Sequence, residues 1–338
     1  QGLSPKRAQL LARLAAERSH LYLQLEGLDD EHLSGLPAVG NWTAAALLAD
    51  TANSEKIAAD NLSRLANNRD TEIRPSIDEA PPEPRDTTSP HPFAGISFDE
   101  AIAIAQKERR NFLATLDRLE DEDLLRRVRS RSGRRIRPGK WATRPYRRDA
   151  QISADLARWR ATLPLPDPAL RTIHSALLRP ILTLSRNEFL ALASLIPPDD
   201  RESRPLEGIW TLKQMIGHLV DYEGLGIVAL SAVAAGVEPD YKPPISSFDT
   251  FNKERGEAWT GVTWNETWAK YEATRHELLS IAESLPAESL VQPFLAPWQK
   301  TTTACGYLLD MAQHEREHAD GLRRALGLPA LPRRLGRG

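Results

Sequence analysis

The sequence predicts an all-α protein made of two tandem four-helix bundles. Long stretches carry apolar residues at spacings of three and four, which is the period of a helix that buries one face. Glycine and proline gather between these stretches, and no segment shows the strict alternation of a half-buried strand. The same motifs occur twice in the same order, which indicates an internal duplication of one helical unit.

Paired motifs relate the two copies. "NWTAAALLADTANSEKIAADNLSRL" is similar to "IWTLKQMIGHLVDYEGLGIVALS", with Trp42 opposite Trp210 and Glu55 opposite Glu223. Further on, "SFDEAIAIAQKERRNFLATLDRLEDEDL" parallels "TWNETWAKYEATRHELLSIAESLPAESL". The copies end on "RWRATLPLP" and "GLRRALGLP". Chance similarity between Leu- and Ala-rich helices is the alternative, but the shared order favours duplication.

Each copy offers four amphipathic helices, which are the components of a bundle. In copy one we expect them at 4–27, 42–65, 97–118 and 143–163, and in copy two at 170–196, 210–235, 263–284 and 301–326. The connection between the second and third helices is long in each copy, and in copy one it is Pro-rich ("SIDEAPPEPRDTTSPHPFAG"). Such a connection can cross one end of a bundle and shape the mouth of a site.

The boundary between the copies falls at "PLPDPALR". We therefore expect a first bundle over residues 1–166, a second over 167–330, and a basic tail over 331–338. We expect the second bundle to carry a complete metal site and the first to carry a degenerate version of it.

Composition excludes several classes of protein. The 338 residues hold 44 Lys and Arg against 46 Asp and Glu, so the net charge of -2 gives no general match to nucleic acid. A single cysteine, Cys305, excludes an internal disulfide and fits a reducing compartment. No run approaches the ~20 apolar residues that span a bilayer. We expect a cytoplasmic protein that does not act at a membrane.

One segment departs from this neutral balance. "RRVRSRSGRRIRPGK", from Arg126 to Lys140, is densely basic but lacks the interleaved aromatic residues that stack on single strands. A solvated arm paired with the protein's own acids is the usual outcome for such a segment, so nucleic acid is not the expected partner.

Two histidines near the C-terminus suggest a metal site. His314 and His318 lie one helical turn apart, so both imidazoles can reach one ion at about 2.0–2.1 Å. Their stripe also contains Tyr307 and Met311, so it faces the core. Surface histidine pairs at this spacing are common, and the pair alone is weak support for a metal.

A third histidine strengthens the metal hypothesis. His218 shares an inward stripe with Met215 and Tyr222 on the second helix of the same copy. Three inward imidazoles would be costly to bury without a partner, and a metal ion removes that cost. Three nitrogen ligands with an open position are typical of a catalytic site. Zinc is the default expectation, and nickel or iron also suits imidazole ligands.

These residues carry a resemblance to a family. A Trp followed eight positions later by His ("WTLKQMIGH"), "FDTFN" before the third helix, and a terminal "HEREH" resemble the DinB-like superfamily of four-helix metalloproteins. The resemblance implies that His218, His314 and His318 are the metal ligands. Similar members include S-transferases that use bacillithiol or mycothiol, a mycothiol-dependent isomerase and metal-dependent hydrolases.

Acidic residues near the histidines have two interpretations. Asp221 and Asp310 lie near the ligand face, where each would orient an imidazole or accept a proton; ordinary surface charge is the alternative. Glu223 has a counterpart in copy one, which favours a structural role. Glu315 and Glu317 point about 100° away from the neighbouring histidines, and we expect them to be solvated.

Copy one lacks the histidine triad. Alignment of the tryptophans puts Asp50 opposite the first histidine. Alignment of the terminal motifs puts Gln151 and Asp155 opposite the other two, and a one-residue shift puts apolar residues there. We expect an ion-pair network in place of the metal, and an Asp/Gln/Asp metal site is the alternative. The candidate members of the network are Asp50, Asp155, Arg144 and Arg148.

The sequence thus favours a metal-dependent enzyme of the thiol S-transferase or hydrolase type, which activates a thiol or water for attack on a small electrophilic substrate. A low-molecular-weight thiol would then be a second cofactor. The alternative is a non-catalytic, stress-associated protein that binds a metal or ligand and uses copy one as a scaffold. The duplication would mimic a dimer of bundles within one chain, so we expect a monomer or a homodimer.

Overall fold

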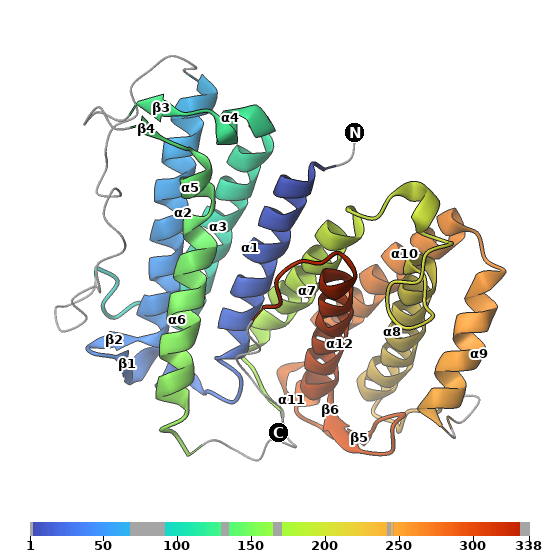
Figure 1. The fold of residues 1–338 in the computed structure, drawn as a ribbon. Helices are drawn as coiled ribbons and strands as arrows, with labels where there is room; N and C mark the ends of the chain where they lie inside the picture. Colours follow the sequence, from blue (N-terminus) through green and yellow to red (C-terminus); the bar gives the residue numbers. More distant parts are fainter. Residues whose placement is uncertain are drawn as a thin grey trace. The chain divides into compact units, whose positions relative to one another are not determined.

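The computed structural model describes residues 3–67, 92–129, 135–164, 171–241, 245 and 247–331. Helices account for most of this part of the chain, as Figure 1 shows, and the predicted all-α class is confirmed. The chain divides into two compact units. We call Ala16–Pro164 the N-terminal unit, and Gln1–Ala15 together with Leu165–Gly338 the C-terminal unit.

The long helices of the first copy lie close to the predicted ranges. They are α1 (Pro5–Leu23), α2 (Ala44–Asn67), α3 (Phe98–Asp117) and α6 (Arg144–Arg160). Between them lie a short π-helical turn (Glu31–Gly35), α4 (Asp121–Leu125) and α5 (Gly139–Ala142). In the N-terminal unit α2 packs against α3 and α6. Most of the Pro-rich connection, residues 68–91, lies outside the described residues.

Among its described residues the second copy has the predicted four helices and one further long helix. The four are α7 (Leu178–Ala193), α8 (Leu212–Ala235), α10 (Trp264–Ser284) and α12 (Ala304–Ala325). Short 3-10 turns (Ser175–Leu177, Pro198–Asp200) and α11 (Ala287–Leu290) connect them. The additional helix α9 (Phe248–Thr260) fills the long connection and packs on α8. The sequence analysis identified its first residues, "FDTFN", but did not predict the helix.

Three two-stranded antiparallel hairpins also escaped prediction. They are β1 (Pro37–Val39) with β2 (Trp42–Thr43), β3 (Val128–Arg129) with β4 (Arg135–Ile136), and β5 (Pro293–Leu295) with β6 (Thr301–Thr303). The second hairpin lies within the basic segment, of which residues 130–134 are outside the described chain. So is the predicted basic tail after Leu331. These strands are too short for an alternating pattern to be detected.

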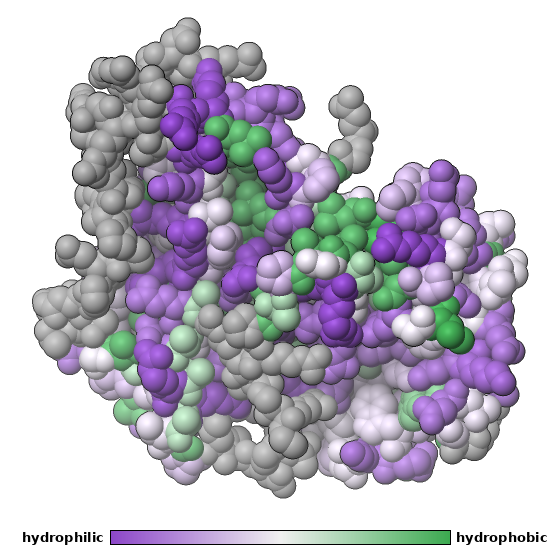
Figure 2. Space-filling model, in the orientation of Figure 1, coloured by the Kyte–Doolittle hydropathy of each residue, from purple (hydrophilic) through white to green (hydrophobic). Residues whose placement is uncertain are grey.

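Helix α8 carries the first histidine and is the most apolar helix of the described chain. Thr211 and Gln214 form a reciprocal capping box at its start, and Gly236 ends it with a left-handed backbone at φ 69°. By length and hydropathy α8 also meets the criterion for a membrane span, contrary to our expectation, although half of that window is buried. Helices α9, α10 and α12 pack against α8, so its apolar composition is that of a helix in the core of a bundle. On the face that Figure 2 shows, hydrophilic residues cover most of the described surface.

A network of buried charges lies at the centre of the C-terminal unit. Glu223 on α8 accepts hydrogen bonds from Arg186 on α7 and Arg275 on α10, with N–O distances of 2.5–2.9 Å. The same arginines pair with Glu315 on α12, which also accepts from the Tyr271 hydroxyl at 2.8 Å. Glu315 has 0% exposure, so the expectation that it is solvated was wrong. Glu223 has the structural role that its counterpart suggested.

The N-terminal unit contains the same network. Arg18 lies 3.0 Å from both Glu55 and Asp149, and Arg109 lies 2.7 Å from Glu55. All four side chains are buried, and they come from the equivalent four helices. The pairs Arg18 and Arg186, Glu55 and Glu223, Arg109 and Arg275, and Asp149 and Glu315 therefore correspond.

This correspondence corrects the alignment of the last helices. Because Asp149 corresponds to Glu315, Arg148 is the counterpart of His314, and Ile152 is the counterpart of His318. The terminal "LPLP" and "LGLP" motifs had placed Gln151 opposite His314, three residues away. The buried network defines the register better than the terminal motifs, because four side chains must meet in each copy.

Candidate metal centre

The three predicted histidines lie together inside the C-terminal unit. His218 extends from α8, and His314 and His318 extend from one face of α12. The Nε2 atom of His314 is 2.8 Å from Nε2 of His218 and 3.1 Å from Nε2 of His318. One ring nitrogen from each histidine lies within 4.8 Å of the other two. The ring nitrogens thus converge on one point.

Burial keeps the imidazoles of His218 and His314 neutral. His218 is 4% exposed and His318 is 8% exposed. Burial and the neighbouring histidines lower the pKa of His218 from 6.5 to about 2. Burial and His318 lower the pKa of His314 from 6.5 to about 3. A neutral imidazole offers a lone pair on one ring nitrogen, so His218 and His314 each present a lone pair.

Glu207 orients one of the rings, and the sequence analysis missed it. Its Oε2 atom lies 2.8 Å from Nδ1 of His318. A carboxylate accepts a hydrogen bond, so Nδ1 carries the proton and the lone pair of His318 is on Nε2, towards the other rings. Glu207 pairs with Trp210 in a β-bridge, which fixes its backbone. Gly321 provides the space that the Glu207 carboxylate occupies, because a Cβ atom at this position would lie 2.7 Å from Oε2 of Glu207.

No spacing in the sequence relates Glu207 to the histidines, so its role became apparent only from the fold. Glu207 lies 111 residues from His318 along the chain and precedes α8 in a connecting segment, so no helical spacing links the two. Gly321, near the end of α12, was a local sign that a neighbour approaches this part of the helix closely.

Aromatic rings surround the histidines. The ring centroids of Trp210 and Tyr222 lie 4.6 and 4.5 Å from that of His218, and Tyr222 is also 4.6 Å from His314. The Tyr222 hydroxyl donates to Asn252 of α9 at 3.1 Å, and burial raises the pKa of Tyr222 to about 12. Phe251 of the same helix packs against Tyr222. Helix α9 thus places the "FDTFN" motif beside the cluster.

The two predicted aspartates have other partners. Asp221 accepts hydrogen bonds from Arg255 and from the indole of Trp259 at 2.5 and 2.7 Å, which joins α9 to α8. Asp310 pairs with Arg171 at 2.6 Å. Neither of these contacts is to an imidazole. Their assignment as orienting groups stays a prediction, and Glu207 makes the contact that was expected of them.

The equivalent position in the N-terminal unit holds an ion pair. Asp50 and Arg148, the counterparts of His218 and His314, lie 2.5 Å apart. This is the pair that the sequence analysis anticipated, although Asp155 pairs with its helix neighbour Arg158. Val39 occupies the position of Glu207, because it pairs with Trp42 as Glu207 pairs with Trp210. The imidazoles and the orienting carboxylate have changed together.

The cluster in the C-terminal unit fits a divalent metal ion. Two imidazole nitrogens that bind one ion at about 2.0–2.1 Å lie roughly 2.9–3.4 Å apart, depending on the angle between them. The measured 2.8 and 3.1 Å are close to this range. A proton on His314 satisfies only one of its two contacts, and the buried Nδ1 of His218 has no partner among the described residues. A cation shared by the three lone pairs resolves the conflict at His314, while Nδ1 of His218 carries the ring proton.

The fold and the histidine cluster define a class of protein. Two helical units follow each other in one chain, and the described part of the C-terminal unit holds a histidine triad that suits a transition metal. The sequence profile of the DinB superfamily matches residues 5–145 and again residues 181–320, and the chain belongs to this superfamily. The two matches agree with tandem bundles that arose by duplication. No curated protein and no solved structure matches the chain significantly.

Proposed function

We propose that His218, His314 and His318 bind one divalent transition metal ion, most simply zinc, and that this centre activates a thiol or water for attack on a small electrophilic substrate. The observation that supports this is the convergence of three imidazole Nε2 atoms on one point. Three protein ligands leave an open position, as in catalytic sites.

A bound divalent ion lowers the pKa of a coordinated water or thiol and so supplies a nucleophile near neutral pH. The residues of the chain prepare the site for this. Glu207 keeps the lone pair of His318 on Nε2. Trp210 and Tyr222 exclude water from the imidazoles, and Asn252 holds the Tyr222 hydroxyl beside the cluster. A substrate that reaches the open position meets these aromatic rings.

Metal content tests the proposal directly. Purified full-length protein should contain one metal ion per chain, and the His218→Ala variant should contain none. His276, exposed on α10, provides the control, because His276→Ala should keep its metal. Glu207→Gln should bind the metal about 10- to 100-fold more weakly in competition with a chelator, since it loses the charge on the orienting group. Equal metal content in wild type and His218→Ala would refute the metal site.

Activity separates the two proposed reaction types. Metal-loaded protein would be tested with electrophiles and low-molecular-weight thiols, and separately with esters and amides. Turnover that requires a thiol supports an S-transferase, and turnover without one supports a hydrolase. A metal-replete protein that is inert in both assays would favour the non-catalytic binding role. The single cysteine supports a reducing, cytoplasmic setting for either reaction.

The N-terminal unit has a different proposed role. We infer that it binds no metal at the equivalent position and acts as a scaffold, because the Arg148 guanidinium already supplies a positive charge beside Asp50. Replacement of Asp50, Arg148 and Ile152 by His, together with Val39→Glu, should raise the metal content from one ion to two. Wild-type protein with two ions per chain would contradict this inference.

A further inference from the structure

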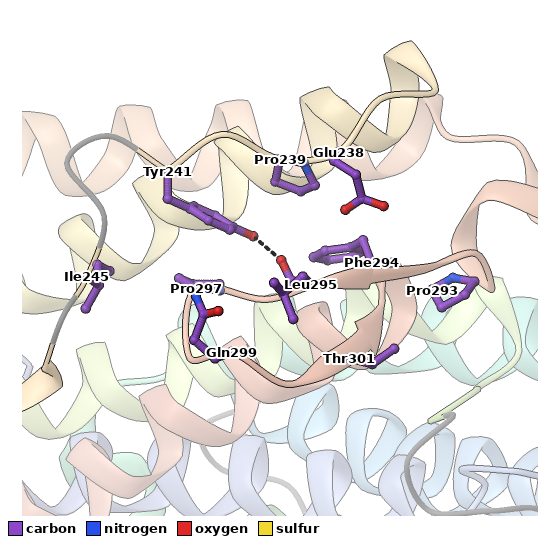
Figure 3. Close-up of a pocket in the computed structure, with 10 residues that line it drawn as sticks. All are labelled: Glu238, Pro239, Tyr241, Ile245, Pro293, Phe294, Leu295, Pro297, Gln299 and Thr301. Atoms are coloured by element: carbon purple, nitrogen blue, oxygen red, sulfur yellow. Dashed lines mark hydrogen bonds between the residues drawn. The ribbon is translucent and has the colours of Figure 1, made fainter.

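The C-terminal unit contains a cavity of about 660 Å³ formed by two separate segments. Figure 3 shows Glu238, Pro239 and Tyr241, from the segment after α8, facing the β5–β6 hairpin. The Tyr241 hydroxyl donates to the backbone carbonyl of Leu295 at 3.3 Å and connects the segments. This volume is within the range of small-molecule sites, about 300–1,000 Å³.

Most of the cavity wall is apolar. Prolines from both segments, the buried Phe294 ring and the half-buried Tyr241 ring provide it. Glu238 is the one charged side chain among the described lining residues. Burial and the Glu238 carboxylate both raise the pKa of Tyr241, so the phenol is neutral and lies in the field of that carboxylate. The described part of the wall therefore combines apolar surface with the negative charge of Glu238.

The tip of the hairpin has an unusual backbone. Gln299 lines the cavity and has φ 60°, the one positive value among the described residues other than glycine. Hairpin loops of this kind normally place glycine at such a position, because a Cβ atom is disfavoured there. Non-glycine residues in this conformation cluster at ligand sites. The glutamine adds an amide side chain to the wall at the cost of backbone strain.

We propose that this cavity binds a hydrophobic organic ammonium ion. The ammonium group would pair with the Glu238 carboxylate and lie near the Tyr241 ring face, whose quadrupole attracts cations. The apolar part of the ligand would lie against Phe294 and the prolines. The Glu238 carboxylate would repel an anionic ligand.

The cavity is close to the histidine helix, but none of its described lining residues is a histidine. Phe294 and Trp298 of the hairpin region pack on Tyr307, with ring centroids 6.1 and 5.1 Å apart. Tyr307 lies in α12, two helical turns before His314. Ligand binding at the cavity and metal binding at the histidines can therefore be tested separately in one chain.

Three matched probes test the proposal: benzylammonium, neutral benzyl alcohol and anionic benzoate, each titrated into the full-length protein by calorimetry. Benzylammonium should bind most tightly. Glu238→Gln should weaken its binding about two- to fivefold, as expected for a pair with an exposed carboxylate, and leave benzyl alcohol unchanged. Glu257→Gln, an exposed acid on α9, should change nothing. Benzoate binding as tightly as benzylammonium, or no effect of Glu238→Gln, would overturn the proposal.

A second pair of variants locates the bound probe. Thr301→Tyr places a large ring at an exposed strand position in the cavity wall and should abolish benzylammonium binding. Val291→Tyr, at an exposed position outside the wall, should not. His218→Ala should lose its metal and still bind benzylammonium with wild-type affinity. Retained binding in Thr301→Tyr would place the probe elsewhere and refute the assignment.

Discussion

The buried charge network makes a quantitative prediction about stability. In the C-terminal unit, two arginines and two glutamates form a balanced group in which every side chain is at most 9% exposed. Glu223→Gln keeps the shape of the side chain and removes one negative charge. Arg186 and Arg275 then share Glu315 alone, which leaves an excess positive charge in the interior.

The expected cost follows from these contacts. An ion pair at about 4 Å is worth about 4 kcal/mol at an effective dielectric constant of 20, and Glu223 contacts two arginines. Part of this is recovered, because the carboxylate no longer has to be desolvated. Removal of one partner from a buried pair typically costs about 3–5 kcal/mol, and we expect a loss in this range. With a slope of about 2 kcal/mol/M, the urea midpoint falls by roughly 1.5–2.5 M.

Urea unfolding followed by tryptophan fluorescence measures this shift. Glu277→Gln, an exposed change on α10, is the control and should alter stability by less than about 0.5 kcal/mol. Glu55→Gln tests the same argument in the N-terminal unit, where Arg18 and Arg109 would lose their shared carboxylate. A loss below about 1 kcal/mol in Glu223→Gln would show that the network contributes little, and would refute the reasoning.

Two further predictions concern the site and its neighbouring helix. Metal-free protein should lose stability as the pH falls below 6.5, because the unfolded chain protonates His218 and His314 while the folded chain, with pKa values of about 2 and 3, does not. At pH 5.5 each contributes a loss of roughly 1.4 kcal/mol, measurable by urea unfolding of chelator-treated protein; equal stability at pH 7.5 and 5.5 would contradict the buried neutral state. Gly217→Ala should destabilise by about 1–3 kcal/mol, because its Cβ would lie 2.3 Å from the Trp259 ring of α9. Gly224→Ala on the same helix meets no atom within 4 Å and should be neutral or stabilising, so equal effects would exclude the contact as the cause.

Helix positions and the meeting of the histidines could be predicted because both depend on local spacing. The 3.6-residue period located the long helices to within a few residues, apart from the start of α7. His314 and His318 had to share a face of α12, and the apolar neighbours of His218 showed that it points inward. Helix α9 was missed because its sequence is mostly polar and its contacts with α8 depend on single residues such as Gly217.

Contacts between distant segments could not be predicted from one helix at a time. Glu315 was expected to face solvent because it lies about 100° from His314 around α12. That helix is enclosed on more than one side, however, and Glu315 faces Arg186 on α7 and Arg275 on α10. Glu207 was missed for a related reason, since a β-bridge in a connecting segment brings it to His318.

The comparison of the two units separates what the bundle needs from what the site needs. Both units keep two arginines and two acids at the crossing of four helices, so this network belongs to the architecture. The adjacent position differs: three imidazoles in one unit, and Asp50 with Arg148 in the other. An arginine there brings its own positive charge, so that unit can hold its second and last helices together without an ion. We propose that the unit with imidazoles instead obtains its cation from solution, and this contrast between the units is the strongest physical argument for a metal at the C-terminal site.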